Sequence, residues 1–180
     1  MGPGPGFNPD NGRVTDDSSF TTPGLYGPTR IRVTLPDGWA VTSVQFDGRD
    51  ITDEALDARS GDVLANVRVV VTNKVNVVSG SITDAKGATT ADGTVLLFAE
   101  DTQKWTDDSR FVRSARPDQQ GRFQIKGLPP GDYLAVAMDY VEDGGWNDPE
   151  YLESIRRYGQ RVRLGESGTQ IVALRLLSPQ

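Results

Sequence analysis

The chain has 180 residues, of which 36% are hydrophobic, and its formal net charge is −6. The negative balance argues against a general affinity for nucleic acid or for anionic membrane. There is no cysteine and no histidine, which excludes disulfides, Cys/His zinc centres, haem with a His or Cys ligand, cysteine nucleophiles and Ser-His-Asp triads. None of these centres is therefore expected. We predict no enzyme activity, no catalytic residue, no cofactor and no metal site, and oxygen ligands for calcium are weighed separately below.

No stretch approaches the ~20 consecutive apolar residues that span a bilayer, so membrane insertion is not expected. The first residues, MGPGPGFNPDNGR, lack the basic and apolar regions of a signal peptide. We expect the sequence to be a processed or excised piece of a longer chain. Residues 1–17 are rich in Gly, Pro, Asn and Asp, which predicts an N-terminal tail with little to bury.

The segments that follow alternate polar and apolar residues as strands do. This alternation predicts strands over 30–35 and 39–46, and Asp47-Gly48 predicts a tight hairpin after the second of them. The β-branched run 67–78 is broken at Asn73-Lys74, which predicts two strands with a short junction.

The second half of the chain carries more strand patterns and one helix pattern. The helix is predicted over 149–158, because Asp148 offers an N-cap, Pro149 suits the first turn and Gly159 ends the pattern. Strands are predicted over 79–84, 94–99, 110–115, 122–126, 132–139, 160–164 and 169–177.

An internal similarity relates the two halves. Phe20 and Gly24 recur as Phe123 and Gly127, both at an offset of 103 residues. Two tandem modules explain this similarity, and we place them at residues 18–75 and 76–180. The predicted fold is all-β: two tandem Greek-key β-sandwich modules, with one short helix in the second.

The two modules differ at their beginnings. The second has strand patterns over 79–84 and 94–99 ahead of its Phe-Gly segment, whereas the first has only the tail there. The first, incomplete module is therefore expected to keep an open sheet edge. Another subunit, an upstream part of a longer chain, or the tail itself would each close it. We assign this assembly edge to Phe7, Phe20, Ile31 and Val33.

The most specific motif is the segment 118–137, DQQGRFQIKGLPPGDYLAVA, in which a Gly turn leads into one strand and GLPPGDY leads into the next. Together with the segment 78–87, VSGSITDAKG, it resembles the carboxypeptidase regulatory-like domain family. The resemblance covers residues 77–177 and implies a transthyretin-like, seven-stranded sandwich with one short helix and no catalytic group. The first half resembles the preceding module of multi-domain bacterial surface and outer-membrane proteins.

Individual residues of this motif have folding roles. Gly87, Gly121 and Gly131 suit turn positions that need a positive φ. Phe123 and Tyr133 are expected to point into the sandwich or along its rim.

Two kinds of ligand are considered. Trp146, Tyr140 and Trp105 are candidate ligand-binding residues because aromatic rings stack on sugars, and the alternative is that each tryptophan plugs an end of a sandwich. Acidic loops offer oxygen ligands to calcium, but none has the spacing of an EF-hand, and solvated loop carboxylates are the alternative.

These observations predict a non-catalytic structural or interaction module of a bacterial extracellular or cell-surface (cell-envelope) protein. We expect it to associate by strand addition at the open edge of the first module, as a filament subunit does. The expected partners are other protein subunits or flanking domains of the same chain. The alternative is a carbohydrate-binding accessory domain of a larger enzyme or transporter, with a glycan as its ligand.

Overall fold

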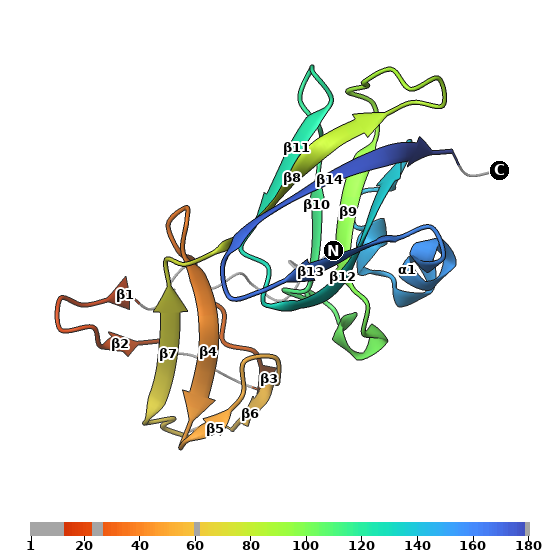
Figure 1. Cartoon of the computed structure of the whole chain (residues 1–180). Helices are drawn as coiled ribbons and strands as arrows, with labels where there is room; N and C mark the ends of the chain where they lie inside the picture. The colour runs from red at the N-terminus through yellow and green to blue at the C-terminus, as the bar shows by residue number, and fades with distance from the viewer. Residues whose placement is uncertain (1–12, 23–26, 60–61, 179–180) are drawn as a thin grey trace, which may run out of the picture. The chain divides into compact units, whose positions relative to one another are not determined.

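The computed structural model describes residues 13–22, 27–59 and 62–178 (Figure 1). The described chain is all-β apart from one short α-helix and two 3₁₀ turns. It divides into two compact units, one of residues 1–33 and 43–69 and the other of residues 34–42 and 70–180.

The first unit is built from small sheets. Among its described residues, the buried hydrophobic side chains are Val44, Ile51, Leu56 and Ala58. Its strands include β1 (Arg13–Val14) paired with β2 (Phe20–Thr21), and β3 (Gly27–Thr29) paired with β6 (Leu56–Ala58). A three-stranded sheet has the order β5 (Arg49–Asp50), β4 (Ala40–Phe46), β7 (Val67–Thr72), and its strands β4 and β7 have residues in both units.

The predicted hairpin at Asp47-Gly48 is confirmed. Strands β4 and β5 pair in the register Gln45↔Asp50 and Phe46↔Arg49, and Asp47 and Gly48 have φ values of 48° and 81°. Positive φ at both central residues is the requirement of a two-residue type I′ turn, which Asp-Gly meets.

The prediction of a strand over 30–35 is wrong. Residues 30–36 have no strand geometry, although Ile31, Val33 and Leu35 are half-buried and the residues between them are exposed. Alternation reports which side chains are shielded from water. It does not show that a neighbouring strand is there to accept the backbone hydrogen bonds.

The β1–β2 hairpin was not foreseen from the sequence, because its strands have only two residues each. Its turn is held by the carboxylate of Asp17, which accepts hydrogen bonds from the hydroxyls of Thr15 (2.5 Å) and Ser19 (2.8 Å) and from the Ser19 amide (3.1 Å). The Thr15 and Ser19 hydrogen bonds lower the pKa of Asp17 to about 2.

The second unit is a sandwich of two sheets. The sheets meet where β12 and β14 pair in parallel, at Ala137↔Leu176 and Met138↔Leu177. One sheet has the order β11 (Arg122–Lys126), β8 (Asn76–Thr83), β14 (Gly168–Leu177), and the other has the order β10 (Val112–Ala115), β9 (Thr94–Ala99), β12 (Gly131–Met138), β13 (Gln160–Leu164).

Most strand predictions for this unit are confirmed within two residues, with one difference. Strand β8 runs without a break from Asn76 to Thr83, where the sequence predicted one strand ending at 78 and another beginning at 79. The predicted positive φ values of Gly87, Gly121 and Gly131 are also confirmed, at 84°, 73° and 154°.

Two hydrophobic layers lie on opposite faces of the sheet formed by β10, β9, β12 and β13. One lies between the two sheets, where Phe123 and Tyr133 are 5% and 1% exposed and pack with Val172. The other lies on the far side of strands β9 and β12, where α1 (Pro149–Arg156) packs through Leu152 and Ile155 (Figure 1). Strands β9 and β12 are therefore buried on both faces, which explains their nearly continuous apolar sequences.

The predicted helix is confirmed with a shorter C-terminal end. The side chain of Asp148 accepts a hydrogen bond from the Glu150 amide at 2.9 Å, and Pro149 occupies the first turn. The helix ends at Arg156 rather than at Tyr158. Gly159 then passes close to Leu134, where a Cβ atom would lie 2.7 Å from the Leu134 Cβ.

Candidate functional site

The open edges of the sheets are the features with the clearest capacity for interaction. A strand that pairs on one side only leaves a row of backbone amides and carbonyls available to another chain, and proteins commonly block such edges with charge, proline or short length. The strands with one open side among the described residues can therefore be compared for these blocking features.

Three edge strands of the sandwich carry blocking charges. Strand β13 contains Arg161 and Arg163, whose side chains are 80% and 88% exposed. Strand β11 has Arg122 and Lys126 at its two ends, both exposed. Strand β10 is short and contains the exposed Arg113. A strand of another chain that paired with any of these edges would have to accommodate the exposed arginine or lysine side chains.

The β14 edge, which we define as Gly168–Arg175, is different. These residues pair in parallel with β8 on one side, and among the described strands none pairs with their other side. The only charged side chain of β14 is Arg175, whose guanidinium donates to the Ala85 carbonyl at 2.7 Å. The stretch contains no proline, and Ile171 in its middle is 81% exposed.

The β7 edge, which we define as Val67–Thr72, is the second one with little protection. Strand β7 is at the end of the three-stranded sheet and has the sequence VRVVVT, with Arg68 as its single charge. Its exposed residues are Arg68 and Val71, and Val71 is 39% exposed.

The residues that the sequence assigned to the assembly edge lie elsewhere. Phe7 is outside the described residues. Phe20 is half-buried in β2 and faces Val14 of β1. Ile31 and Val33 are half-buried in the non-strand segment between β3 and β4. Among the described strands, β7 forms one end of the three-stranded sheet and the two-residue β5 forms the other. Sequence reasoning did not single out β7 because its pattern resembles that of any other strand.

Of the predicted ligand-binding residues, Trp105 is enclosed by the protein. It follows η1 (Thr102–Lys104), is 6% exposed, and donates its indole N–H to the Ala99 carbonyl at 2.7 Å. Its ring meets Phe98 edge-on, with centroids 5.6 Å apart. Trp105 therefore presents no ring face to a ligand and is left out of the proposed sugar site.

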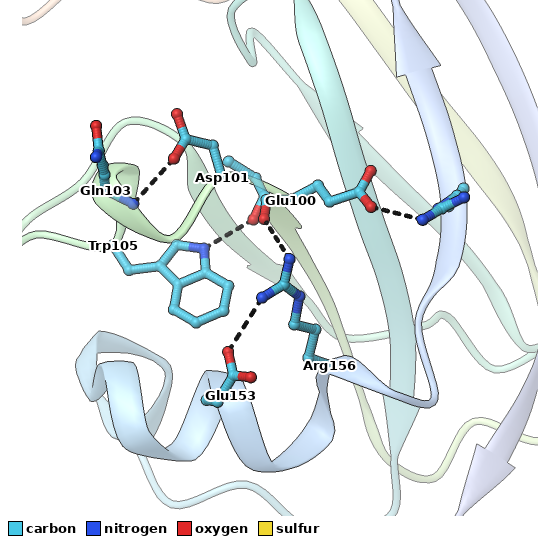
Figure 2. Close-up of polar contacts among 8 residues, drawn as sticks. Glu100, Asp101, Gln103, Trp105, Glu153 and Arg156 are labelled. Carbon is cyan, nitrogen blue, oxygen red and sulfur yellow. Dashed lines mark hydrogen bonds and ion pairs between the residues drawn. The ribbon is translucent and has the colours of Figure 1, made fainter.

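Polar contacts around Trp105 tie the loop after β9 to the helix (Figure 2). Arg156 of α1 donates to the Glu100 carbonyl at 3.2 Å and forms an ion pair with Glu153 at 3.4 Å. The Arg156 guanidinium also lies 5.9 Å from the centroid of the Trp105 ring. Across the strands, Arg161 pairs with the Glu100 carboxylate at 2.9 Å. These contacts hold the helix against the sheet.

The other two predicted aromatic residues are more accessible. Tyr140 follows β12 and is 72% exposed, and Trp146 is half-buried in η2 (Gly145–Asn147). Trp146 and Tyr151 both pack against the hydrophobic layer under α1. The Tyr151 hydroxyl is buried, and no described residue forms a hydrogen bond with it. Burial, reinforced by the negative charge of Asp139, raises the pKa of Tyr151.

The described ranges contain neither a metal centre nor a membrane-spanning helix by the following criteria. No group of three or more acidic side chains there is placed to hold a metal ion. Among the same residues, no helix combines the length and the apolar character needed to cross a bilayer.

Comparison with known proteins identifies fold-level likenesses. No protein-family model and no curated protein matches this chain. Among solved structures, BcpA, the major pilin subunit of Bacillus cereus, is 10% identical, with 79% of this chain and 57% of that chain aligned and a TM-score of 0.38. GBS52, a minor pilin of Streptococcus agalactiae, is 15% identical over 70% of this chain and 60% of that chain, with a TM-score of 0.35.

A third similar structure is PA1324 from Pseudomonas aeruginosa, which is provisionally assigned as a carbohydrate-binding protein. It is 21% identical, with 57% of this chain and 88% of that chain aligned and a TM-score of 0.36. The chain thus spans less than two thirds of the length of each pilin. At these identities the likeness concerns the fold alone, so we draw the function from the chain's own residues.

Proposed function

We propose that this chain is a non-catalytic structural and interaction module that associates with other protein subunits by strand addition at the β7 edge. The observation that carries the proposal is the low protection of this edge, with one charge, Arg68, in the sequence VRVVVT. An added strand would pair with the free backbone groups of β7 and extend the sheet.

The small size of the first unit supports the same proposal. Its described buried hydrophobic side chains are few, and the sheet that it shares with residues 40–42 and 70–72 has three described strands, one of them only two residues long. Sheets of this size gain stability when further strands or a packed partner extend them. Association therefore offers this unit burial that its own residues do not supply.

The location that we propose is the surface or envelope of a bacterium. The support is the resemblance of segments 78–87 and 118–137 to carboxypeptidase regulatory-like domains, whose expected fold agrees with the seven-stranded sandwich described above. Within that sandwich, the motif forms β11, the GLPP loop and β12, with the Tyr133 hydroxyl donating to the Pro129 carbonyl at 2.8 Å. These are folding roles and carry no reactive group.

The proposal is tested by placing a positive charge on the β7 edge. The Val71→Lys variant is expected to weaken self-association by about tenfold or more, which corresponds to roughly 1.4 kcal/mol, because a charge on an edge strand opposes pairing. Size-exclusion chromatography with light scattering, over a range of concentrations, measures the change from the monomer mass of 19.5 kDa.

Val63→Lys is the matched control, since Val63 is 88% exposed and lies outside every strand. It should associate as the unmodified protein does. If the unmodified chain is a monomer at every concentration and β7 binds no other protein, the proposal is contradicted.

A second candidate function is carbohydrate binding at Tyr140 and Trp146. The favouring observation is that an exposed tyrosine ring and a half-buried indole follow β12 within eight residues of its end. Sugars bind by stacking on aromatic rings and by hydrogen bonding to polar groups.

For this candidate, Trp146→Ala is expected to abolish binding on a glycan array while the far-UV circular dichroism spectrum stays unchanged. Trp39→Ala is the control, because Trp39 is 45% exposed and belongs to a different part of the chain. Equal glycan signals for the unmodified protein and both variants would rule out this site.

A further inference from the structure

We propose that the β14 edge is a second association site, at which β14 pairs antiparallel with β14 of a second copy so that the two Ile171 side chains face each other. This inference rests on the proposed function of the chain as an association module. It concerns a different strand, and it can therefore fail separately.

More side chains of β14 are exposed than the inward-outward alternation of a sandwich strand would leave exposed. Strands of a sandwich alternate between inward and outward side chains, and Val172 and Leu174 are accordingly buried. The preceding residues Gly168–Ile171 are all exposed, on both faces of the strand. This segment is held by its pairing with β8, from Gly168↔Asn76 to Ile171↔Ser79, and its opposite side is open among the described strands.

The composition of the edge favours a second copy as the occupant. A strand pairing with itself around a two-fold axis makes a closed, symmetric contact from one surface. Side chains that face each other must lie on the same face of the sheet. If Ile171 is on the axis, Thr169 of one copy faces Ala173 of the other, so that two small side chains flank the central isoleucine pair.

The charges select the antiparallel direction. Arg175 is the only charged residue of β14, and it lies at one end of the open stretch. Antiparallel pairing separates the two Arg175 side chains to opposite ends of the contact, and brings each one towards the turn that contains Glu166 of the other copy. Parallel pairing would instead place like charges side by side, which destabilises a sheet.

Together, the β7 and β14 edges explain how a filament would form. A chain with one symmetric edge stops at a dimer, whereas a chain with two such edges can link to a neighbour at each and continue indefinitely. Blocking either edge alone should therefore leave dimers, and blocking both should leave monomers.

Cross-linking tests the contact directly, because the chain has no cysteine of its own. In the Ile171→Cys variant, the two Cβ atoms of the proposed contact would lie about 4.5–5.5 Å apart, close to disulfide range. Mild oxidation should convert most of the protein to a covalent dimer. Val63→Cys, at an exposed position outside the edge, should give only background dimer.

The register is tested with a mixture of two variants. Thr169→Cys and Ala173→Cys should cross-link with each other in a mixture and poorly when each is alone. An Ile171→Cys variant that cross-links no better than Val63→Cys would overturn the proposal. Efficient cross-linking of Thr169→Cys to itself would overturn the register.

Ile171→Lys separates this inference from the proposed function. If both edges operate, Ile171→Lys and Val71→Lys each give a particle of twice the monomer mass of 19.5 kDa, and the double variant gives a monomer. If Ile171→Lys associates as the unmodified chain does while Val71→Lys is monomeric, the β14 contact is rejected and the β7 proposal stands. An unmodified chain that is monomeric throughout rejects both.

Discussion

Replacing Trp105 with alanine is expected to lower the free energy of unfolding of the second unit by about 3–5 kcal/mol. The change removes a side chain that is 6% exposed, its edge-on contact with Phe98, and the hydrogen bond from its indole to the Ala99 carbonyl. It also leaves the Arg156 guanidinium without the ring beside it, so the link between α1 and the loop after β9 should loosen.

Denaturant unfolding followed by far-UV circular dichroism measures this loss, since a signal from tryptophan fluorescence would itself change in the variant. Trp39→Ala is the matched control. Trp39 is 45% exposed in the segment before β4, so its removal should cost less than about 1 kcal/mol. A Trp105→Ala variant as stable as the control would show that the indole is not a packing residue, and would return it to the list of candidate ligand contacts.

Replacing Gly80 with alanine is expected to destabilise the same unit by about 3 kcal/mol, because the strand has no room for a Cβ atom. A Cβ atom built at Gly80 overlaps the backbone carbonyl oxygen of Val172 and lies 3.1 Å from the Phe123 ring. Gly80 pairs with Val172 of β14 on one side and with Phe123 of β11 on the other. A flexible side chain could move aside, but here the backbone of β14 must shift.

Thermal and denaturant unfolding of Gly80→Ala measure the loss, with Ser81→Ala as the control one residue along the same strand. Ser81 belongs to the opposite face of the sheet, so its replacement should change stability by less than about 0.5 kcal/mol. The Gly80 variant should also lose cross-linking when combined with Ile171→Cys, because the displaced strand is the one that forms the β14 edge. Normal stability of Gly80→Ala would mean that β8 and β14 are not as close as described.

Much of the second unit could be predicted from local sequence, and the reasons are physical. Strand β9 was predicted with its observed bounds, Thr94–Ala99, because a short run of apolar residues between turns is typical of a strand buried on both faces. The start of α1 was predicted because Asp148 and Pro149 satisfy the first turn of a helix by themselves. Such signals act over a few residues and need no knowledge of the rest of the fold.

The errors arose where the outcome depends on a neighbour that the sequence does not reveal. Residues 30–35 alternate as a strand does, yet they form no strand, whereas β1 and β2 pair although each has two residues. Trp105 was named as a candidate ligand-binding residue with a packing role as the alternative, and the helix and Phe98 enclose it. Whether a tryptophan faces water is decided by elements that are distant along the chain.

The sequence by itself determined the all-β class, the turns, the helix and the absence of cysteine and histidine chemistry, because each follows from residue type or from short-range spacing. Only the tertiary structure decided which strands are edges. Ile171 and Val71 belong to patterns that look like those of paired strands, and their exposure follows from what lies beside β14 and β7. An open edge is a property of strand order, and strand order is set by packing across the whole sheet rather than by any local segment.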